Sequence, residues 1–491
     1  ALSGEVSIST LDASGKSITV VGTSDNAGLN AVDQTWPVTT HGNITFKNLT
    51  FKFSTTQSFY NCGIIPDGGS LVFENCKFEG LVTSFGNITY NNCQFTNTVK
   101  GSYCAWIYSG KAVYNNCTFS GVDRAVKVGA GANVVGLYEN CTFEAQMQNK
   151  CAVEIDCSQH TNGTPFYITI NNPSIKNMGV AEHYAVGAAG VCNLETSGVG
   201  LGIVNLDGKA YSVAHTAAQL EALAAVGKDV TIELASATYS EDINLTVAKL
   251  GTGKKGDVVF KAAEGVTPVI AGTVTLGYFE NRVGAVAWDG KVTFDGITFD
   301  HAAPATHSLN IQNLKGLTLK NCTVVGDGEY GISAPGSNPT GLSSISNCSF
   351  VNAGLQLGGN FATGLVIDEC SFEESCVNVQ GGNSVTIQNC NFENTLTNTH
   401  VGQSFYLIRS NATPITVKNC AISIDSELSE VATAQEKWGI LWNRKNLDWT
   451  VENVSLTMTD AALKQTELLV TKCTSTGKIN TNNLTVNGIA L

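Results

Sequence analysis

The sequence predicts an all-β fold that consists of two tandem right-handed parallel β-helices, in residues 1–207 and 208–491. Three observations support this prediction. One short motif recurs along most of the chain, each copy follows a run of alternating apolar and polar residues, and one helical segment interrupts the strands near the middle. A motif that recurs every 20 to 50 residues or so is typical of solenoid proteins.

The recurring motif is Asn-Cys-x-(Phe/Ile/Val) or a near variant of it. Its copies begin at Asn61, Asn75, Asn92, Asn116, Asn140, Asn321, Asn347, Glu369, Asn389 and Asn419. The spacing between copies is irregular, which indicates loops of different length between equivalent corners. Asn tolerates the left-handed backbone conformation and forms hydrogen bonds through its amide, so one Asn per coil predicts a ladder of stacked Asn side chains.

Each motif follows a short strand pattern such as residues 86–90 or 384–388, and alternation continues past the corner. Cys93 and Phe95 should therefore point into the core while Gln94 points out. An antiparallel barrel or sandwich also has many short strands. Hairpins, however, would reverse the strand direction at each turn and bring unlike corners together, so the constant phase of the motif favours parallel stacking.

Residues 216–226 have the pattern of an amphipathic helix. Thr216 and Gln219 fit a capping box, Leu220 and Leu223 share one face, and Gly227 ends the segment. A strand is expected at 230–234. Solenoids need capping elements over their open ends, so this helix should cap the second β-helix. No equivalent helix precedes the strand near residue 4, and a further N-terminal domain or a second copy of the chain is the expected cover for that end.

Composition excludes several classes of partner. The net charge is -13, only 14% of residues are charged, and no basic patch is apparent, which argues against nucleic-acid binding. No apolar run is long enough to insert into a membrane. The 16 cysteines recur mostly in the corner motif, which indicates packing. The spacings Cys151–Cys157 and Cys370–Cys376 also suit disulfides, but free thiols are favoured.

The alternating strands, Asn-Cys-Thr-Phe corners and cap helix resemble the right-handed β-helix superfamily, which includes pectate lyases, polygalacturonases, phage tailspikes and bacterial adhesins. Residues 46–208 look closest to uncharacterised β-helix repeats of surface proteins from gut anaerobes and their phages. The resemblance implies the fold and an exposed location. It implies no particular chemistry, because one fold carries many functions.

Glycoside hydrolysis would need clustered carboxylates. The acidic pairs are Glu154 with Asp156, Asp327 with Glu329, and Asp368 with Glu369. The polygalacturonase motifs Asn-Thr-Asp, Asp-Asp, Gly-His-Gly and Arg-Ile-Lys are missing, so each pair is interpreted first as solvated turn surface and only second as catalytic.

A lyase would need Ca²⁺ and a basic residue beside a uronate. Of the few basic residues, Arg124, Lys127 and Arg409 lie near strands and Arg444 lies in a loop, without an obvious carboxylate triad. His301 and His307 lack metal-binding spacing. We therefore expect no cofactor and no metal, with Ca²⁺ required only by the lyase alternative.

Aromatic residues are the candidate binding groups, because their faces stack on sugar rings and anchor protein contacts. Tyr103, Trp106 and Tyr108 should face the same way, either as core or as an external platform, with core favoured. Trp438 and Trp442 lie in the least repetitive region, a candidate C-terminal cap or docking surface.

The leading hypothesis is a non-catalytic extracellular or cell-surface protein that binds glycans or a partner protein. The alternatives are a virion fibre, tailspike or capsid decoration, which suits unpaired thiols and a fixed oligomer, and a polysaccharide lyase or glycoside hydrolase.

Overall fold

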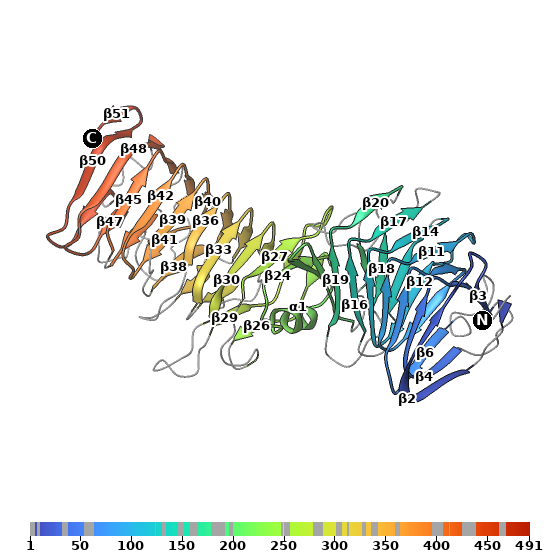
Figure 1. Cartoon of the computed structure of the whole chain (residues 1–491). Coiled ribbons are helices and arrows are strands. Elements are labelled where there is room, and N and C mark those ends of the chain that lie inside the picture. The colour runs from blue at the N-terminus through green and yellow to red at the C-terminus, as the bar shows by residue number, and fades with distance from the viewer. Residues whose placement is uncertain are drawn as a thin grey trace. The chain divides into compact units, whose positions relative to one another are not determined.

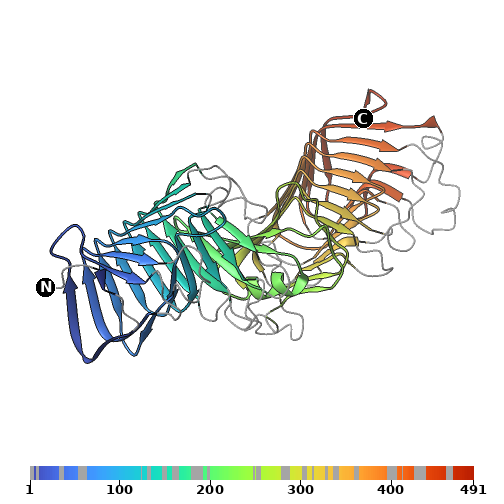
Figure 2. The same cartoon turned by 90° about the vertical axis from the view of Figure 1, so that its right-hand side faces the viewer.

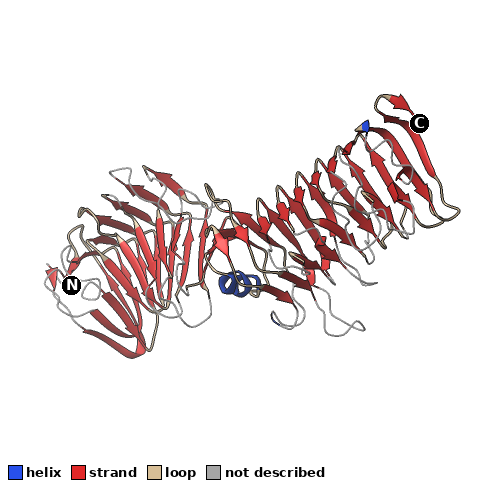
Figure 3. Ribbon diagram, turned by 180° about the vertical axis from the view of Figure 1, so that it is seen from behind, coloured by secondary structure: helices blue, strands red, loops and turns tan. Residues whose placement is uncertain are grey.

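The computed structural model confirms an all-β protein built from coils of short parallel strands. Figure 3 shows strands in nearly every described segment and the helix α1 (Ala217–Ala224) in blue. The chain divides into two compact units, residues 1–215 and 216–491. The structure describes residues 5–6, 10–31, 38–53, 63–122, 124–129, 134–145, 152–157, 165–177, 192–195, 200–246, 249, 256–277, 288–300, 307–311, 314–326, 330–334, 342–358, 364–394, 406–411, 413–424, 438–460 and 468–491.

Each coil of unit 1 contributes strands to three parallel stacks, called a, b and c in chain order, with the Asn corner between a and b. Stack a contains β2 (Thr10–Val21), β4 (Val38–Lys47), β7 (Leu71–Glu74), β10 (Ile88–Asn91), β13 (Lys111–Asn115), β16 (Val135–Glu139), β19 (Phe166–Asn171) and β22 (Gly202–Leu206). Stack b contains β1 (Glu5–Val6), β3 (Gly28–Ala31), β5 (Thr50–Phe53), β8 (Lys77–Glu79), β11 (Gln94–Asn97), β14 (Thr118–Gly121), β17 (Thr142–Ala145) and β20 (Ser174–Lys176). Stack c contains the first residues of β4, then β6 (Gly63–Asp67), β9 (Val82–Phe85), β12 (Ala105–Ser109), β15 (Val126–Gly129), β18 (Val153–Asp156) and β21 (Cys192–Glu195).

Unit 2 repeats the three-stack arrangement, and Figure 1 shows the strands of its stack a lying side by side from β24 to β48. Stack a contains β24 (Val230–Leu234), β27 (Val258–Ala262), β30 (Trp288–Asp295), β33 (Leu314–Lys320), β36 (Leu342–Ser346), β39 (Leu365–Asp368), β42 (Val385–Gln388), β45 (Ile415–Lys418), β48 (Trp449–Met458) and β50 (Ile479–Val486). Stack b contains β25 (Thr238–Tyr239), β28 (Val269–Ile270), β31 (Thr298–Asp300), β34 (Thr323–Val325), β37 (Ser349–Val351), β40 (Ser371–Glu373), β43 (Asn391–Asn394), β46 (Ala421–Ile424) and the second half of β48. Stack c contains β26 (Ile243–Thr246), β29 (Val274–Gly277), β32 (Leu309–Ile311), β35 (Tyr330–Ala334), β38 (Gly354–Leu357), β41 (Val377–Val379), β44 (Ile408–Ser410), β47 (Trp438–Asn443) and β49 (Leu468–Cys473).

The Asn corners have the predicted backbone conformation. Asn92 has φ 54° and Asn347 has φ 50°, and Glu369 takes the same conformation with φ 54°. The predicted ladder of amides is also present: Asn347 Nδ2 donates to Asn321 Oδ1 at 2.7 Å, and Asn483 Nδ2 donates to Asn453 Oδ1 at 3.0 Å. Side-chain bonding across coils therefore supplements the backbone pairing of the strands.

The core follows the predicted alternation. Cys93 and Phe95 are buried while Gln94 is exposed. Equivalent aromatic residues stack from coil to coil, as in the 4.6 Å separation of the Phe78 and Phe95 rings. Stacking at this distance is one of the arrangements that aromatic pairs prefer.

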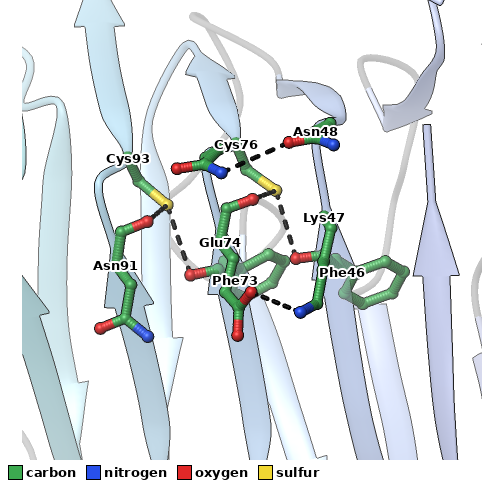
Figure 4. A network of polar contacts seen from close by, with 9 residues as sticks. Phe46, Lys47, Asn48, Phe73, Glu74, Cys76, Asn91 and Cys93 are labelled. Atoms are coloured by element: carbon green, nitrogen blue, oxygen red, sulfur yellow. Dashed lines mark hydrogen bonds and ion pairs between the residues drawn. The ribbon is translucent and has the colours of Figure 1, made fainter. Parts of the chain in front are cut away.

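The corner Cys residues that the structure describes are buried thiols, and all of them except Cys348 have two backbone acceptors. Cys76 Sγ donates to the Phe46 carbonyl of the preceding coil at 3.5 Å, and Cys93 Sγ does the same to Phe73 at 3.6 Å (Figure 4). A second bond goes to the residue two positions earlier, Glu74 or Asn91. Cys suits this inward position because its side chain is small and its S–H group is only a weak hydrogen-bond donor. Cys370 and Cys376 are separate free thiols, so the disulfide alternative for that pair is wrong. The other pair includes Cys151, which lies outside the described residues.

The helix α1 has the capping box that the sequence predicts. Gln219 N donates to Thr216 Oγ1 and Thr216 N donates to Gln219 Oε1, both at 3.2 Å. Leu220 and Leu223 are buried, and α1 packs against β24 and β26, the first strands of two stacks of unit 2. Glu221 Oε1 also accepts a 2.7 Å bond from the Asn244 backbone N–H of β26. The helix therefore satisfies part of an open strand edge, as a cap must.

Both units close with an antiparallel two-residue hairpin. In unit 1, β22 turns through Asp207 and Gly208 into β23 (Lys209–Ala214), and in unit 2, β50 turns through Asn487 and Gly488 into β51 (Ile489–Ala490). All four turn residues have positive φ, as a type I′ turn requires. Because β23 pairs with β22, the boundary lies at 215/216 rather than at the expected 207/208. Figure 2 shows the strands of each unit from a second direction.

Candidate functional site

The stacked strands β12, β15 and β18 of unit 1 place one aromatic, one cationic and one acidic residue in register. Trp106 of β12 lies beside Lys127 of β15, and Lys127 lies beside Glu154 of β18. The neighbours of Trp106, Ala105 and Ile107, are buried, whereas Trp106 itself is only half-buried. The alternation of a strand therefore turns all three registered side chains away from the core.

The aromatic residues form an external row. The Tyr103 and Trp106 ring centroids are 5.9 Å apart, those of Trp106 and Tyr108 are 6.4 Å apart, and Phe85 lies 5.1 Å from Tyr108. Trp106 and Tyr108 are half-buried, so each presents part of its ring to solvent. Tyr103 is buried at 6% exposure beneath this row. The core interpretation therefore holds for Tyr103, whereas Trp106 and Tyr108 lie as the platform alternative describes.

Two cations cover the row. Lys127 Nζ is 4.8 Å from the Trp106 ring centroid, and Arg124 Cζ is 5.1 Å from that of Tyr103. Both distances suit a cation–π interaction. Trp106 is also fixed by a 3.2 Å bond from its Nε1 to the Gly129 carbonyl. The platform is thus held in one orientation before any ligand arrives, which lowers the entropy cost of binding.

Both carboxylates of the first acidic pair belong to the same surface. Glu154 Oε1 accepts a 2.8 Å bond from the Tyr103 hydroxyl, and Glu154 Oε2 lies 3.9 Å from Arg124 Nη1. Asp156 Oδ2 lies 3.5 Å from Lys127 Nζ. We call Trp106, Tyr108, Lys127, Glu154 and Asp156 the β12 platform. Its two acids are balanced by Lys127 and by the adjacent Arg124, so this surface is close to neutral.

Burial and the negative charge of Glu154 raise the pKa of Tyr103. The Tyr103 phenol therefore stays protonated at physiological pH and remains a donor to Glu154. It is a positioning residue for the platform, because its ring lies under the row and its hydroxyl holds both Glu154 and Arg124.

The other predicted site residues lie elsewhere. Asp327 and Glu329 fall outside the described residues, as does His301, and the Trp438 side chain is not described. Asp368 is structural, because its two oxygens accept bonds from Gln388 Nε2 at 2.9 Å and Asn389 Nδ2 at 2.8 Å. Trp442 is 1% exposed and lies on stack c of unit 2.

A polar groove of about 330 Å³ follows the Asn corners of unit 2. Its lining includes Asn321, Asn347, Glu369 and Asn389. The amides of these corners already donate to neighbouring coils, so they are not free to bind a ligand. Within the described part of the chain, no cluster of three or more His, Cys, Asp or Glu residues is arranged to hold a metal ion. The described helices likewise include none with the length and apolar character of a membrane span.

Comparison with known families supports the fold. The family described as "Right handed beta helix region" matches residues 284–456, which contain strands β30 to β46 and most of β48. With the parallel stacks of strands, this match identifies the architecture as the right-handed parallel β-helix. No curated protein matches the sequence.

Proposed function

We propose that this protein is a non-catalytic, surface-exposed or secreted β-helix protein that binds neutral glycans on the β12 platform. The observation that carries the proposal is the half-buried pair Trp106 and Tyr108, with hydrogen-bonding side chains on the two following strands. Aromatic faces pack against the C–H faces of sugars, and carboxylate and ammonium groups bond to sugar hydroxyls.

The charge balance of the platform favours a neutral ligand. Glu154 and Asp156 face Arg124 and Lys127, so an anionic sugar would meet acids as well as cations. A neutral sugar can form hydrogen bonds with both, because its hydroxyl groups donate to the carboxylates and accept from the cations. Partner proteins that present Tyr hydroxyls or Trp indole N–H groups are the other ligands that such a platform suits.

One observation favours a hydrolase as the second candidate. Glu154 and Asp156 are two positions apart on one strand, so their side chains leave the same face from Cα atoms about 7 Å apart. Inverting glycosidases use separations of about 6.5–9.5 Å. The competing consideration is that each carboxylate faces a cation, whereas a general acid must keep its proton at working pH. Release of reducing ends from a polysaccharide panel distinguishes this candidate from a binder.

A virion fibre, tailspike or capsid decoration is the third candidate, and the buried free thiols of both units favour it over secretion. Cys76 and Cys322 are examples, and such thiols suit assembly in a reducing cytoplasm. This candidate keeps the glycan-binding role and predicts a trimer or another fixed oligomer by light scattering. A monomeric protein would contradict it.

A glycan array compares the wild-type protein with Trp106→Ala, using Tyr211→Ala as the control. Tyr211 is a half-buried residue of β23 in the same unit, and its strand partner is Val204 of β22 in stack a. Trp106→Ala removes the face on which the sugar stacks, so it should weaken binding to neutral glycans at least tenfold. The control Tyr211→Ala should change the affinity less than twofold. Absence of glycan binding by the wild-type protein, or equal binding by Trp106→Ala, would overturn the proposal.

A further inference from the structure

A second cluster of aromatic and cationic residues lies on stack c of unit 2. Arg409 of β44, Trp442 of β47 and Lys472 of β49 are in register on three neighbouring strands. Tyr406 precedes β44, and Arg444 follows β47. We call these five residues the Trp442 cluster.

Three cations surround the single indole of this cluster. Lys472 Nζ is 3.9 Å from the Trp442 ring centroid, Arg444 Cζ is 5.3 Å from it, and Arg409 Cζ is 5.8 Å from it. Arg409 also lies 4.0 Å above the Tyr406 ring. Three positive charges around one ring repel one another, while each cation–π contact contributes about 0.5–2 kcal/mol of attraction.

No carboxylate of the described residues balances the two arginines. Arg409 uses its Nε to bond Asn378 Oδ1 at 3.2 Å, which fixes the guanidinium, but neither Arg409 nor Arg444 forms an ion pair there. The β12 platform differs on this point, because each of its cations has an acidic partner. In a chain with net charge -13, two neighbouring arginines without an ion pair among the described residues are a local exception.

A polar atom of the same cluster is also without a partner. Trp442 is 1% exposed, and its Nε1 is buried with no hydrogen-bond acceptor. Leaving such a donor unsatisfied costs about 1–3 kcal/mol, which an acceptor from a ligand would recover. The unused donors here are thus one indole N–H and the terminal nitrogens of a fixed guanidinium.

We propose that the Trp442 cluster is an oxyanion-binding site for the sulfate or carboxylate group of an acidic saccharide. Arg409 presents its terminal nitrogens as a planar pair of donors, the geometry that favours bidentate contact with such groups. Arg444, which is exposed, and Lys472 add positive charge at the rim. The site is distinct from the β12 platform in residues and in ligand charge, so it does not depend on the neutral-glycan proposal.

The test is a titration by isothermal calorimetry with three probes: inorganic sulfate, chondroitin sulfate oligosaccharides and oligogalacturonates. Wild-type protein is compared with Arg409→Gln and Arg444→Gln. The control is Lys320→Gln, which removes one exposed charge from stack a of the same unit. Thermal melts establish that each variant is folded, and Trp106→Ala is included to keep the two sites separate.

Binding of a sulfated or a carboxylated oligosaccharide should weaken at least tenfold in Arg409→Gln and severalfold in Arg444→Gln. Lys320→Gln and Trp106→Ala should bind within twofold of wild type. The oligosaccharide that binds more tightly identifies the anionic group. Wild-type protein that binds none of the probes, or a Lys320→Gln loss as large as that of Arg409→Gln, would overturn the proposal and leave the cluster a packing role only.

Discussion

The Tyr103 hydroxyl donates a 2.8 Å hydrogen bond to Glu154 Oε1, although the two residues are 51 positions apart in the chain. Tyr103 precedes β12 and Glu154 lies on β18, so the bond spans the intervening strand β15. Arg124 joins them, because its Nη1 donates to the same hydroxyl at 2.5 Å. This bond connects the aromatic row to the acids and is the reason to treat the two as one surface.

Tyr103→Phe tests that connection. The ring stays, but Glu154 loses a donor and Arg124 loses an acceptor, so unit 1 should be destabilised by about 1–2 kcal/mol. Urea denaturation followed by circular dichroism measures the change. Tyr211→Phe removes a hydroxyl for which no hydrogen bond is seen and should change the stability by less than about 0.5 kcal/mol. Equal effects of the two substitutions would show that the Tyr103 hydroxyl contributes nothing specific.

The Asn corners make a second prediction, for Asn347. Asn347→Ala removes the hydrogen bond to Asn321. It also places alanine at φ 50°, a left-handed conformation that alanine adopts less readily than asparagine. Together the two effects should lower the free energy of unfolding by about 2 kcal/mol. Asn347→Gly loses the bond but tolerates the angle, so it should cost about 1 kcal/mol. Denaturation midpoints give both values. A glycine variant as unstable as the alanine variant would contradict the role given to the left-handed angle.

The aromatic stack of unit 2 should be sensitive to truncation. Phe372 lies between Phe350 at 4.8 Å and Phe392 at 4.5 Å, with nearly parallel rings. Phe372→Ala opens a cavity between coils and should cost about 3–5 kcal/mol, whereas Phe372→Leu should cost about 1.5 kcal/mol or less. Thermal and chemical denaturation measure both. A cost below about 1 kcal/mol for Phe372→Ala would contradict tight packing at this position.

Alkaline pH should destabilise both units through their buried thiols. Burial raises the pKa of Cys104 and of Cys376 to about 12, from an ordinary value of 9.0. Each raised pKa favours the folded state fully below pH 9, and this contribution is lost as the pH rises from 9 to 12, because the unfolded chain ionises first. At pH 10 the loss is about 1.4 kcal/mol per thiol.

The measurement is the urea midpoint at pH 8 and pH 10 for wild type and Cys376→Ala. The variant starts less stable, because it loses buried volume, but it should lose less stability over this pH step. An identical loss in both proteins would show that the Cys376 thiol does not carry the effect.

The corner motif made the fold predictable. Asn, Cys and Phe keep a fixed order around each corner, so the burial of Cys93 and Phe95 and the positive φ of Asn92 follow from alternation alone. The cap helix was predictable because Thr216 and Gln219 bond each other locally. The division at 215/216 differs from the expected 207/208 because the Asp207–Gly208 hairpin sends β23 back along β22, and a strand pattern does not reveal its direction of pairing.

Individual residues of the β12 platform and of the Trp442 cluster were predictable, but their association was not. Trp106, Lys127 and Glu154 are separated by unequal loops, so their registration on neighbouring strands depends on pairing that the sequence pattern does not fix. Sequence reasoning selected the acids and the aromatic residues separately and had no signal to join them. For the same reason it selected Trp442 and missed Tyr406 and Lys472, whose positions matter only once β44, β47 and β49 are aligned.

The most direct test of the account is a calorimetric titration of wild type and Trp106→Ala with the neutral glycan that binds best on the array. Wild type should bind measurably, Trp106→Ala should bind at least tenfold more weakly, and Arg409→Gln should bind with nearly wild-type affinity. Equal affinity of wild type and Trp106→Ala would contradict a glycan site on the β12 platform.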